Sequence, residues 1–255
     1  MIVARIRELV EAEQVPVLGI GPAADMAAEP PGHRPDDLLP GAQSLICFGL
    51  PVPRQVYRMS LYQPETVWRS QNLYYRRLDT LSVRIAALLE ESGARAVPIY
   101  GCMPLDLNAR GVVVGYLNQI RMGAVTGIGI IGKNGLLLHA RYGARLMLGG
   151  VVTSAALPAL RVPEVEAPGC PPDCHICAAA CPAKAIDFAE KRVHVMRCLA
   201  HTARTPMMPR FRFLLLRAWR PQAAARLMNL TAFDEHTFHV CSQCVALCPY
   251  GEKKA

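Results

Sequence analysis

Cysteine is the residue type whose spacing most clearly indicates chemistry in this chain. Eight of its ten cysteines lie in the last third of the 255 residues. The first run, residues 170–181, reads C-P-P-D-C-H-I-C-A-A-A-C, and the second, residues 241–248, reads C-S-Q-C-V-A-L-C. A proline follows each run, and Cys198 lies alone between them. Both runs end in C-x3-C-P, and eight thiolates are the ligand count of two [4Fe–4S] clusters.

The order of the cysteines also predicts how they are shared between the clusters. In ferredoxins with two clusters, the last cysteine of each run binds the cluster of the other run. One cluster is therefore expected on Cys170, Cys174, Cys177 and Cys248, and the second on Cys181, Cys198, Cys241 and Cys244. Zinc is the alternative, because two C-x2-C pairs can form one all-thiolate site. A single zinc site would leave four of these cysteines without a role.

A glycine-rich stretch upstream, residues 127–135, reads G-I-G-I-I-G-K-N-G. It matches G-x-G-x-x-G, but no acid follows that could bind a ribose, and asparagine stands where a triphosphate loop needs Ser or Thr. Residues 107–163 contain no Asp or Glu, and the N–H groups of a glycine-rich loop attract anions. The candidate cofactor-binding residues are Gly127, Gly129, Gly132, Lys133 and Asn134. The alternative is a turn that serves packing alone.

Hydrophobic periodicity predicts the elements that position these residues. Helices are expected over residues 2–13 and 61–92, and strands over 15–20, 44–50 and 96–101. Residues 23–43 are expected to form a long loop. This strand–helix–strand order indicates an α/β layer. Cys47, inside the second strand, is interpreted as core, and Cys102, after the third, as an ordinary thiol.

Composition and charge restrict the class of protein and its partners. A hydrophobic fraction of 52% and a charged fraction of 19% are typical of a globular protein and exclude a disordered one. The net charge of +8 favours anionic partners such as a phosphate-bearing cofactor, an acidic redox protein or RNA. We expect no membrane span and a cytoplasmic location, because the long uncharged stretches, such as residues 38–53 and 146–160, are too short to cross a bilayer.

Residues 163–169 resemble a linker and divide the chain into an α/β domain, 1–162, and a cysteine-rich domain, 163–255. Within the second domain, residues 199–240 form a basic insertion with two short helices expected at Phe211–Trp219 and Gln222–Leu230. Its arginines could form a docking face for RNA or an acidic protein, or it could cap the second cluster. His175 and His201 lie near cluster cysteines and are interpreted as covering or tuning a cluster.

The order of these motifs resembles a known family. The glycine loop is followed by Tyr142-Gly143-Ala144-Arg145, by G-G-V-V-T, and by the cysteine motifs, with Cys198-L-A-H-Thr202 between the runs. This order, over roughly residues 15–255, looks like the epoxyqueuosine reductase family, which is related to the reductive dehalogenases. The resemblance implies an α+β, nitroreductase-like domain of the corrinoid-binding type, followed by a ferredoxin-like domain with two [4Fe–4S] clusters. It also implies that the glycine loop lies at a cobalamin, which the clusters reduce.

The sequence departs from the family at its proton donor. Epoxyqueuosine reductases carry the Asp of a V-D-T-x-P element upstream of the glycine loop, and the corresponding stretch here, residues 111–116, reads G-V-V-V-G-Y. Asp106 and Tyr116 are the remaining candidate proton donors, with a turn residue and a core residue as the alternatives. Reduction of tRNA is therefore not favoured, and the chain resembles a short, divergent member of the group.

The first hypothesis is a reductase. Its clusters take single electrons from a ferredoxin or flavodoxin and pass them to a corrinoid or a small-molecule substrate in the first domain. The alternative is an electron-transfer protein or subunit of the ferredoxin type that has no corrinoid.

Overall fold

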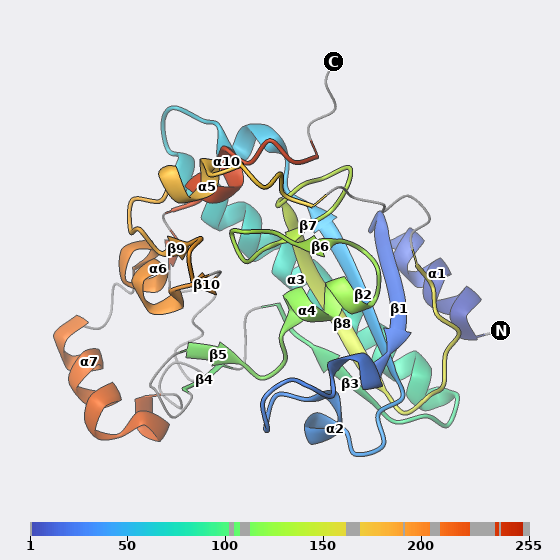
Figure 1. Ribbon diagram of the computed structural model, residues 1–255. Helices are drawn as coiled ribbons and strands as arrows, with labels where there is room; N and C mark the ends of the chain where they lie inside the picture. Colours follow the sequence, from blue (N-terminus) through green and yellow to red (C-terminus); the bar gives the residue numbers. More distant parts are fainter. Residues whose placement is uncertain are drawn as a thin grey trace.

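The computed structural model describes residues 2–101, 105–107, 113–161, 169–190, 192–204, 210–224, 238–239 and 241–251 (Figure 1). Of residues 105–107, 113, 203–204, 210–213 and 238–239 it describes the backbone alone.

The largest sheet positions the rest of the chain. Its four strands lie in the order β1-β2-β8-β3, and all neighbouring strands are antiparallel. They are β1 (Val17–Pro22), β2 (Ser44–Pro51), β3 (Ala96–Ile99) and β8 (Leu146–Thr153). Because β2 and β3 are each antiparallel to β8, they run parallel to one another. The helix α3 (Gln63–Glu91) joins them. The expected strand–helix–strand unit is therefore present, with β8 inserted between its strands.

Helices cover both faces of this sheet. On one face, α1 (Ile2–Ala12) and α3 contribute a row of buried side chains that includes Leu81 and Ile85, which pack with Phe48 of β2. On the other face, Met122 of α4 (Gln119–Val125) is fully buried against the sheet. Figure 1 shows α3 lying along the sheet behind β2 and β8. Burial on both faces explains why these two strands are nearly continuous apolar runs.

The alternation of β2 divides its side chains between the two cores. Ile46 and Phe48 belong to the core with α3, whereas Leu45 and Cys47 belong to the core with α4. Cys47 is fully buried, and this burial raises the pKa of its thiol to about 12. The interpretation of Cys47 as a core residue is confirmed.

Two glycines in β8 allow the helices to approach the sheet closely. A Cβ on Gly149 would lie 2.8 Å from the ring of Phe48 and 3.0 Å from Leu78 of α3. A Cβ on Gly150 would lie 2.5 Å from both the carbonyl oxygen of Ile46 and the methyl group of Met122. Side chains at these positions would therefore push both helical layers away from the sheet.

The predicted elements agree with the structure within a few residues, and two regions differ. The expected loop over residues 23–43 contains the 3₁₀ helix η1 (Ala23–Met26) and the short helix α2 (Pro35–Leu38). The sequence did not predict β8, which is the strand at the centre of the sheet. The mixed α/β class is confirmed.

The other elements are short. Between β2 and β8 they are η2 (Arg54–Tyr57), β4 (Leu105–Leu107), β5 (Val113–Gly115), β6 (Ile130–Ile131) and β7 (Leu137–Leu138). After β8 they are α5 (Ile176–Ala179), β9 (Ile186–Asp187), β10 (Arg192–Val193), α6 (Val195–Thr202), β11 (Ala203–Arg204), α7 (Arg210–Trp219), β12 (Phe238–His239) and α10 (Gln243–Ala246).

Some sequence predictions fall on regions that can be compared only in part. The first expected helix of the insertion is α7, and of the second only residues 221–224 are described, as helix. The expected domain boundary at residues 163–169 falls almost entirely outside the described residues, as does Cys102. In the part of the chain that the structure describes, no helix has the length and apolar character needed to cross a membrane.

Candidate metal centres at the two cysteine runs

The two cysteine runs meet in space. Each contains a four-residue helix, α5 with Cys177 and α10 with Cys244, and these helices lie side by side (Figure 1). After each helix the chain turns in the same way, because the N–H of Cys181 donates to Ala178 and that of Cys248 donates to Val245. The proline that follows each run has no N–H, so it cannot continue the turn. The common spacing thus produces a common local structure.

The first group of thiols combines three cysteines of the first run with the last cysteine of the second. Burial raises the pKa of Cys177, and the neighbouring thiols of Cys170, Cys174 and Cys248 raise it further. Like-charged groups act on one another in this way only at short range. The structure therefore brings together the four residues that the sequence assigns to one cluster.

The second group contains the remaining four cysteines. Burial raises the pKa of Cys244 to about 12, and the thiols of Cys198, Cys241, Cys177 and Cys181 add to this effect. The pKa of Cys198 is likewise raised by burial and by Cys181 and Cys241. Cys177 acts on Cys244 across the boundary, so the two groups are adjacent. The assignment of these cysteines to two clusters, and the identity of the bound metal, stay predictions.

Hydrogen bonds from the surrounding backbone fix several of these cysteines. The N–H of Ala185 donates to Cys181 Sγ over 3.3 Å. The hydroxyl of Thr202 accepts the N–H of Cys241 over 3.0 Å and donates to the carbonyl of the same residue over 3.4 Å. The threonine that follows the isolated cysteine in the sequence therefore ties α6 to the start of the second run.

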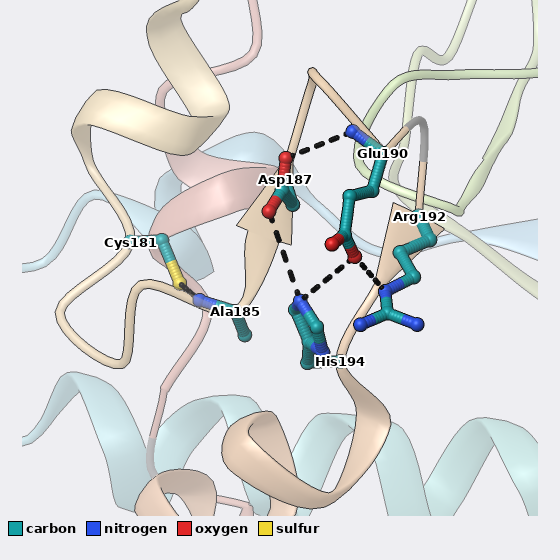
Figure 2. Close-up of polar contacts among 6 residues, drawn as sticks. All are labelled: Cys181, Ala185, Asp187, Glu190, Arg192 and His194. Atoms are coloured by element: carbon teal, nitrogen blue, oxygen red, sulfur yellow. Dashed lines mark hydrogen bonds and ion pairs between the residues drawn. The ribbon is translucent and has the colours of Figure 1, made fainter.

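The hairpin of β9 and β10 lies between Cys181 and Cys198 in the sequence, and Figure 2 shows it beside Cys181. His194 donates its N–H to Ala185 over 2.7 Å, and its carbonyl accepts the N–H of Cys198 over 3.1 Å. A chain of backbone contacts thus leads from Cys181 through Ala185 and His194 to Cys198. These contacts hold the two ends of the hairpin close to one another.

Polar side chains lie close together along the same hairpin. His194 Nε2 lies 3.9 Å from a carboxylate oxygen of Asp187 and 3.9 Å from one of Glu190, and Glu190 pairs with Arg192 over 2.5 Å (Figure 2). The N–H of Glu190 also donates to Asp187, and that hydrogen bond lowers the pKa of the Asp187 carboxyl group. The sequence analysis found no ligand group containing a histidine, because these residues become neighbours only when the hairpin forms.

The end of the glycine loop contacts the first cysteine run. Lys133 donates from Nζ to the carbonyls of Pro171, Pro172 and Cys174 over 2.8, 2.7 and 3.1 Å. Its backbone N–H donates to Cys170 Sγ over 3.5 Å. All three protons of the ammonium group are therefore directed at the loop that carries the first two cysteines.

Asn134 reaches the second run. Its side-chain Nδ2 donates to the carbonyl of Cys244 over 3.5 Å, while its Oδ1 accepts the N–H of Leu136. The ring of Phe188 lies close to both Lys133 and His175. Its centre is 5.1 Å from Lys133 Nζ and 4.9 Å from the centre of the His175 ring. His175 thus packs on Phe188, and its expected role in covering or tuning a cluster stays a prediction.

The glycines of the loop approach the protein's own chain. A Cβ on Gly127 would lie 2.9 Å from Arg161, and one on Gly129 would lie 2.7 Å from the carbonyl of Leu138. A Cβ on Gly132 would lie 2.6 Å from the Leu138 side chain. Internal packing is sufficient to explain these three glycines. Their expected position at a corrinoid stays a prediction.

The two candidate proton donors lie within and just after the β4–β5 strand pair. Asp106 is in β4, and its side chain lies outside the described residues. The hydroxyl of Tyr116 accepts the N–H of Tyr100 over 2.6 Å and donates to the carbonyl of Pro98 over 3.3 Å. Burial raises the pKa of Tyr116 above its usual value. Because its proton is already directed at a carbonyl group, a role in proton transfer requires this contact to open.

Tyr116 lines a cavity of about 400 Å³. Tyr100 and Gln119 form part of its wall, together with Glu29 and His33 from the segment before β2. His33 contacts the carbonyl of Gly115 over 2.9 Å, and Gln119 donates to that of Tyr100 over 2.5 Å. The cavity is within the size range of sites for small molecules. The sequence analysis did not find Glu29, His33 or Gln119, because they form no spaced motif.

Comparison with known proteins gives an independent view of the chain. No family model matches it. An epoxyqueuosine reductase of Lactococcus garvieae is 28% identical over 151 residues, which cover 58% of this chain and 36% of the relative. An epoxyqueuosine reductase structure from Streptococcus thermophilus superposes with a TM-score of 0.57 at 16% identity, over 97% of this chain and 65% of that one. A catabolic reductive dehalogenase superposes with a TM-score of 0.59 at 15% identity, over 97% and 32%.

The resemblance found in the sequence is confirmed. Both groups of proteins named by that resemblance are represented among the similar structures, and at this identity the structural likeness concerns the fold. The chain spans about a third of the length of the curated epoxyqueuosine reductase, with 36% covered, and less than two thirds of the solved enzyme, with 65% covered. Another solved epoxyqueuosine reductase is in complex with a tRNA stem loop, and one reductive dehalogenase structure is described with a mechanism for B12-dependent dehalogenation.

Proposed function

We propose that this chain is an iron–sulfur reductase related to the epoxyqueuosine reductases, and that it delivers single electrons through two [4Fe–4S] clusters. One cluster would be held by Cys170, Cys174, Cys177 and Cys248, and the other by Cys181, Cys198, Cys241 and Cys244. The observation that carries the proposal is the proximity of thiols from the two runs, with Cys248 near Cys177 and with Cys181 near Cys244 and Cys198. Iron–sulfur clusters bound by four thiolates exchange one electron at a time.

The spacing of the thiols supports a polynuclear cluster over zinc. A tetrahedral site with Zn–S bonds of about 2.3 Å places its sulfur atoms about 3.8 Å apart. Among the described residues, the metal-binding side chains that gather within 4.8 Å are those of Asp187, Glu190 and His194, and no three of the cysteines lie that close together. The donor set of eight thiols is also that of two [4Fe–4S] clusters.

The proposed function assigns different roles to the two parts of the chain. Residues 163–255 would form the ferredoxin-like domain, with residues 199–240 as an insertion, and residues 1–162 would hold the electron acceptor. The contacts of Lys133 and Asn134 join the two parts, because one residue contacts the first cysteine run and its neighbour contacts the second. The acceptor would be a corrinoid or a small-molecule substrate.

The described residues fit a corrinoid less well than they fit the clusters. Lys133 and Asn134 are engaged with the cysteine runs, and the neighbouring glycines are filled by packing. We therefore assign no step to a corrinoid. The cavity beside Tyr116 is the better supported site for an acceptor, because Tyr116 and Tyr100 give it aromatic walls and Glu29 and Gln119 give it polar groups.

A ferredoxin or flavodoxin would supply the electrons. The net charge of +8 favours docking of such acidic proteins, since opposite charges accelerate their encounter. A second candidate function is an electron-transfer protein without a corrinoid, which the contacts of the glycine loop with the cysteine runs favour. Reduction of epoxyqueuosine in tRNA is the third, and the missing aspartate in residues 111–116 argues against it.

Anaerobic purification with cobalamin present separates these candidates. The proposed function predicts about eight iron atoms per chain and a cluster absorption that is bleached by dithionite. Cobalt that remains bound through gel filtration would identify a corrinoid as the acceptor, and its absence with full iron would exclude a corrinoid-dependent reductase. Turnover of epoxyqueuosine-containing tRNA would identify the third function. A chain with zinc and without iron would contradict all three.

A further inference from the structure

Lys133 of the glycine loop and Tyr250, at the end of the second cysteine run, converge on the first group of cysteines. Lys133 directs its ammonium group at the carbonyls of the loop between Cys170 and Cys174, and its N–H donates to Cys170 Sγ. Tyr250 follows Cys248 by two residues, and its hydroxyl is close enough to the thiols of Cys170 and Cys248 for these to affect it electrostatically. Neither side chain belongs to the expected ligand set.

The hydroxyl of Tyr250 is in an unusual state. It is buried, and among the described residues it has no hydrogen-bond partner. Leaving a buried hydroxyl unpaired costs about 1 to 3 kcal/mol. The cluster that this group of thiols would hold places thiolate and sulfide sulfurs, which accept hydrogen bonds, beside it. The fit of an orphaned donor to such acceptors supports the cluster at this position.

We propose that Lys133 and Tyr250 set the reduction potential of the [4Fe–4S] cluster held by Cys170, Cys174, Cys177 and Cys248. This inference rests on the proposed function. Reduction adds one electron to the cluster, from the [4Fe–4S]²⁺ to the [4Fe–4S]⁺ state, and takes up no proton. With its thiolates, the cluster becomes more negative, so a nearby ammonium group and O–H or N–H donors stabilise the reduced state and raise the potential.

The glycine loop acquires a role through this proposal. Sequence reasoning interprets Lys133 as a ligand for an anionic cofactor, whereas the structure places all of its polar hydrogens on a cysteine loop. The packed glycines before it bring the loop close to β7, and so fix the lysine relative to the main sheet. Through its positive charge, Lys133 then stabilises the reduced state of the cluster whose cysteine loop it contacts.

The test is an anaerobic redox titration of the full chain with dithionite, followed by the electron paramagnetic resonance signals of both reduced clusters. Lys133→Met removes the charge and keeps the length of the side chain, and Lys133→Arg keeps the charge. Lys184→Met is the matched control, because Lys184 is an exposed lysine that follows Cys181 of the other group. Tyr250→Phe removes only the hydroxyl.

We expect Lys133→Met to weaken reduction of one cluster about tenfold, which is a fall of about 59 mV for a one-electron couple. Tyr250→Phe should weaken the same cluster about threefold, the effect of one net hydrogen bond. Lys133→Arg and Lys184→Met should leave this potential near that of the wild type. The affected signal should be the one whose line shape changes in Cys170→Ser.

Two results would overturn the inference while leaving the proposed function intact. One is a full iron content with unchanged potentials in both Lys133→Met and Tyr250→Phe. The other is an equal fall in both clusters in each variant. If Lys133→Met loses its iron, Tyr250→Phe decides: a lower potential supports the inference and an unchanged one overturns it. A wild-type chain without two clusters would instead contradict the proposed function itself.

Discussion

Gly143 offers the sharpest test of how the second cysteine run is held in place. Its φ of +60° lies in the left-handed region, and a Cβ there would overlap the carbonyl oxygen of Tyr250. Gly251 also has a left-handed backbone, with a φ of +74°. A Cβ on Gly251 would overlap the backbone of Gly143. Gly143 is itself fixed by two hydrogen bonds with His139. The segment after Cys248 is thus held by direct contact between two backbones, which leaves no room for a methyl group.

The magnitude follows from two effects in Gly143→Ala. The left-handed conformation costs a non-glycine residue about 1 to 2 kcal/mol, and the overlap adds about 1 to 3 kcal/mol through displaced backbone. Gly93→Ala separates the two effects. Gly93 has a φ of +86°, and a Cβ there would meet nothing within 4 Å. Gly93→Ala therefore measures the cost of the left-handed conformation without the overlap.

The assay compares both variants after anaerobic reconstitution, by iron content and thermal midpoint. At about 2 to 4 °C per kcal/mol for a chain of this size, Gly93→Ala should lower the midpoint by about 2 to 8 °C and keep about eight iron atoms. Gly143→Ala should lower the midpoint further and lose iron from the cluster that contains Cys248. Equal midpoints and equal iron contents in the two variants would refute the reasoning.

Three further predictions test the roles assigned to the cysteines and to the residues around them. Cys181→Ser and Cys248→Ser should each perturb the resonance signal of the cluster assigned to the opposite run, and an effect confined to the residue's own run would contradict shared ligation. Thr202→Ala removes the acceptor of the Cys241 N–H and should destabilise the fold by about 1 to 3 kcal/mol with reduced iron loading. Thr202→Ser keeps the hydroxyl and should keep both the stability and the iron loading. Equal behaviour of the two variants would count against this role of the hydroxyl. Cys47→Ser places a hydroxyl in the core and should lower the free energy of unfolding by about 1 to 3 kcal/mol with iron content unchanged; loss of iron would show that this thiol is a ligand after all.

The sequence predicted the elements whose pattern is local. The helices α1 and α3 and the strands β1, β2 and β3 appear within a few residues of their expected bounds, because the helices have apolar repeats of helical period and the strands are short apolar runs. The central strand β8 was missed. Its Gly149-Gly150 pair is typical of a turn in sequence, but in the fold Phe48 of β2 and Met122 of α4 occupy the space that side chains would need.

The candidate site, like the fold, could be predicted from the sequence only in part. The cysteines could be grouped in advance, because their count and order restrict the pairings. The contacts of Lys133 with the loop at Pro171 and Pro172 could not, since they join residues 38 and 39 positions apart and depend on where the main sheet places the loop. The orphaned hydroxyl of Tyr250 is likewise invisible in a sequence, because burial and lack of a partner are properties of the folded chain.

The most direct measurement of the central claim is a Mössbauer spectrum of the ⁵⁷Fe-reconstituted chain, taken with its iron and sulfide content. We predict about eight iron atoms and eight sulfides per chain, all in [4Fe–4S] clusters. Four iron atoms in a single cluster, or a chain that binds zinc at these cysteines and no iron, would contradict it.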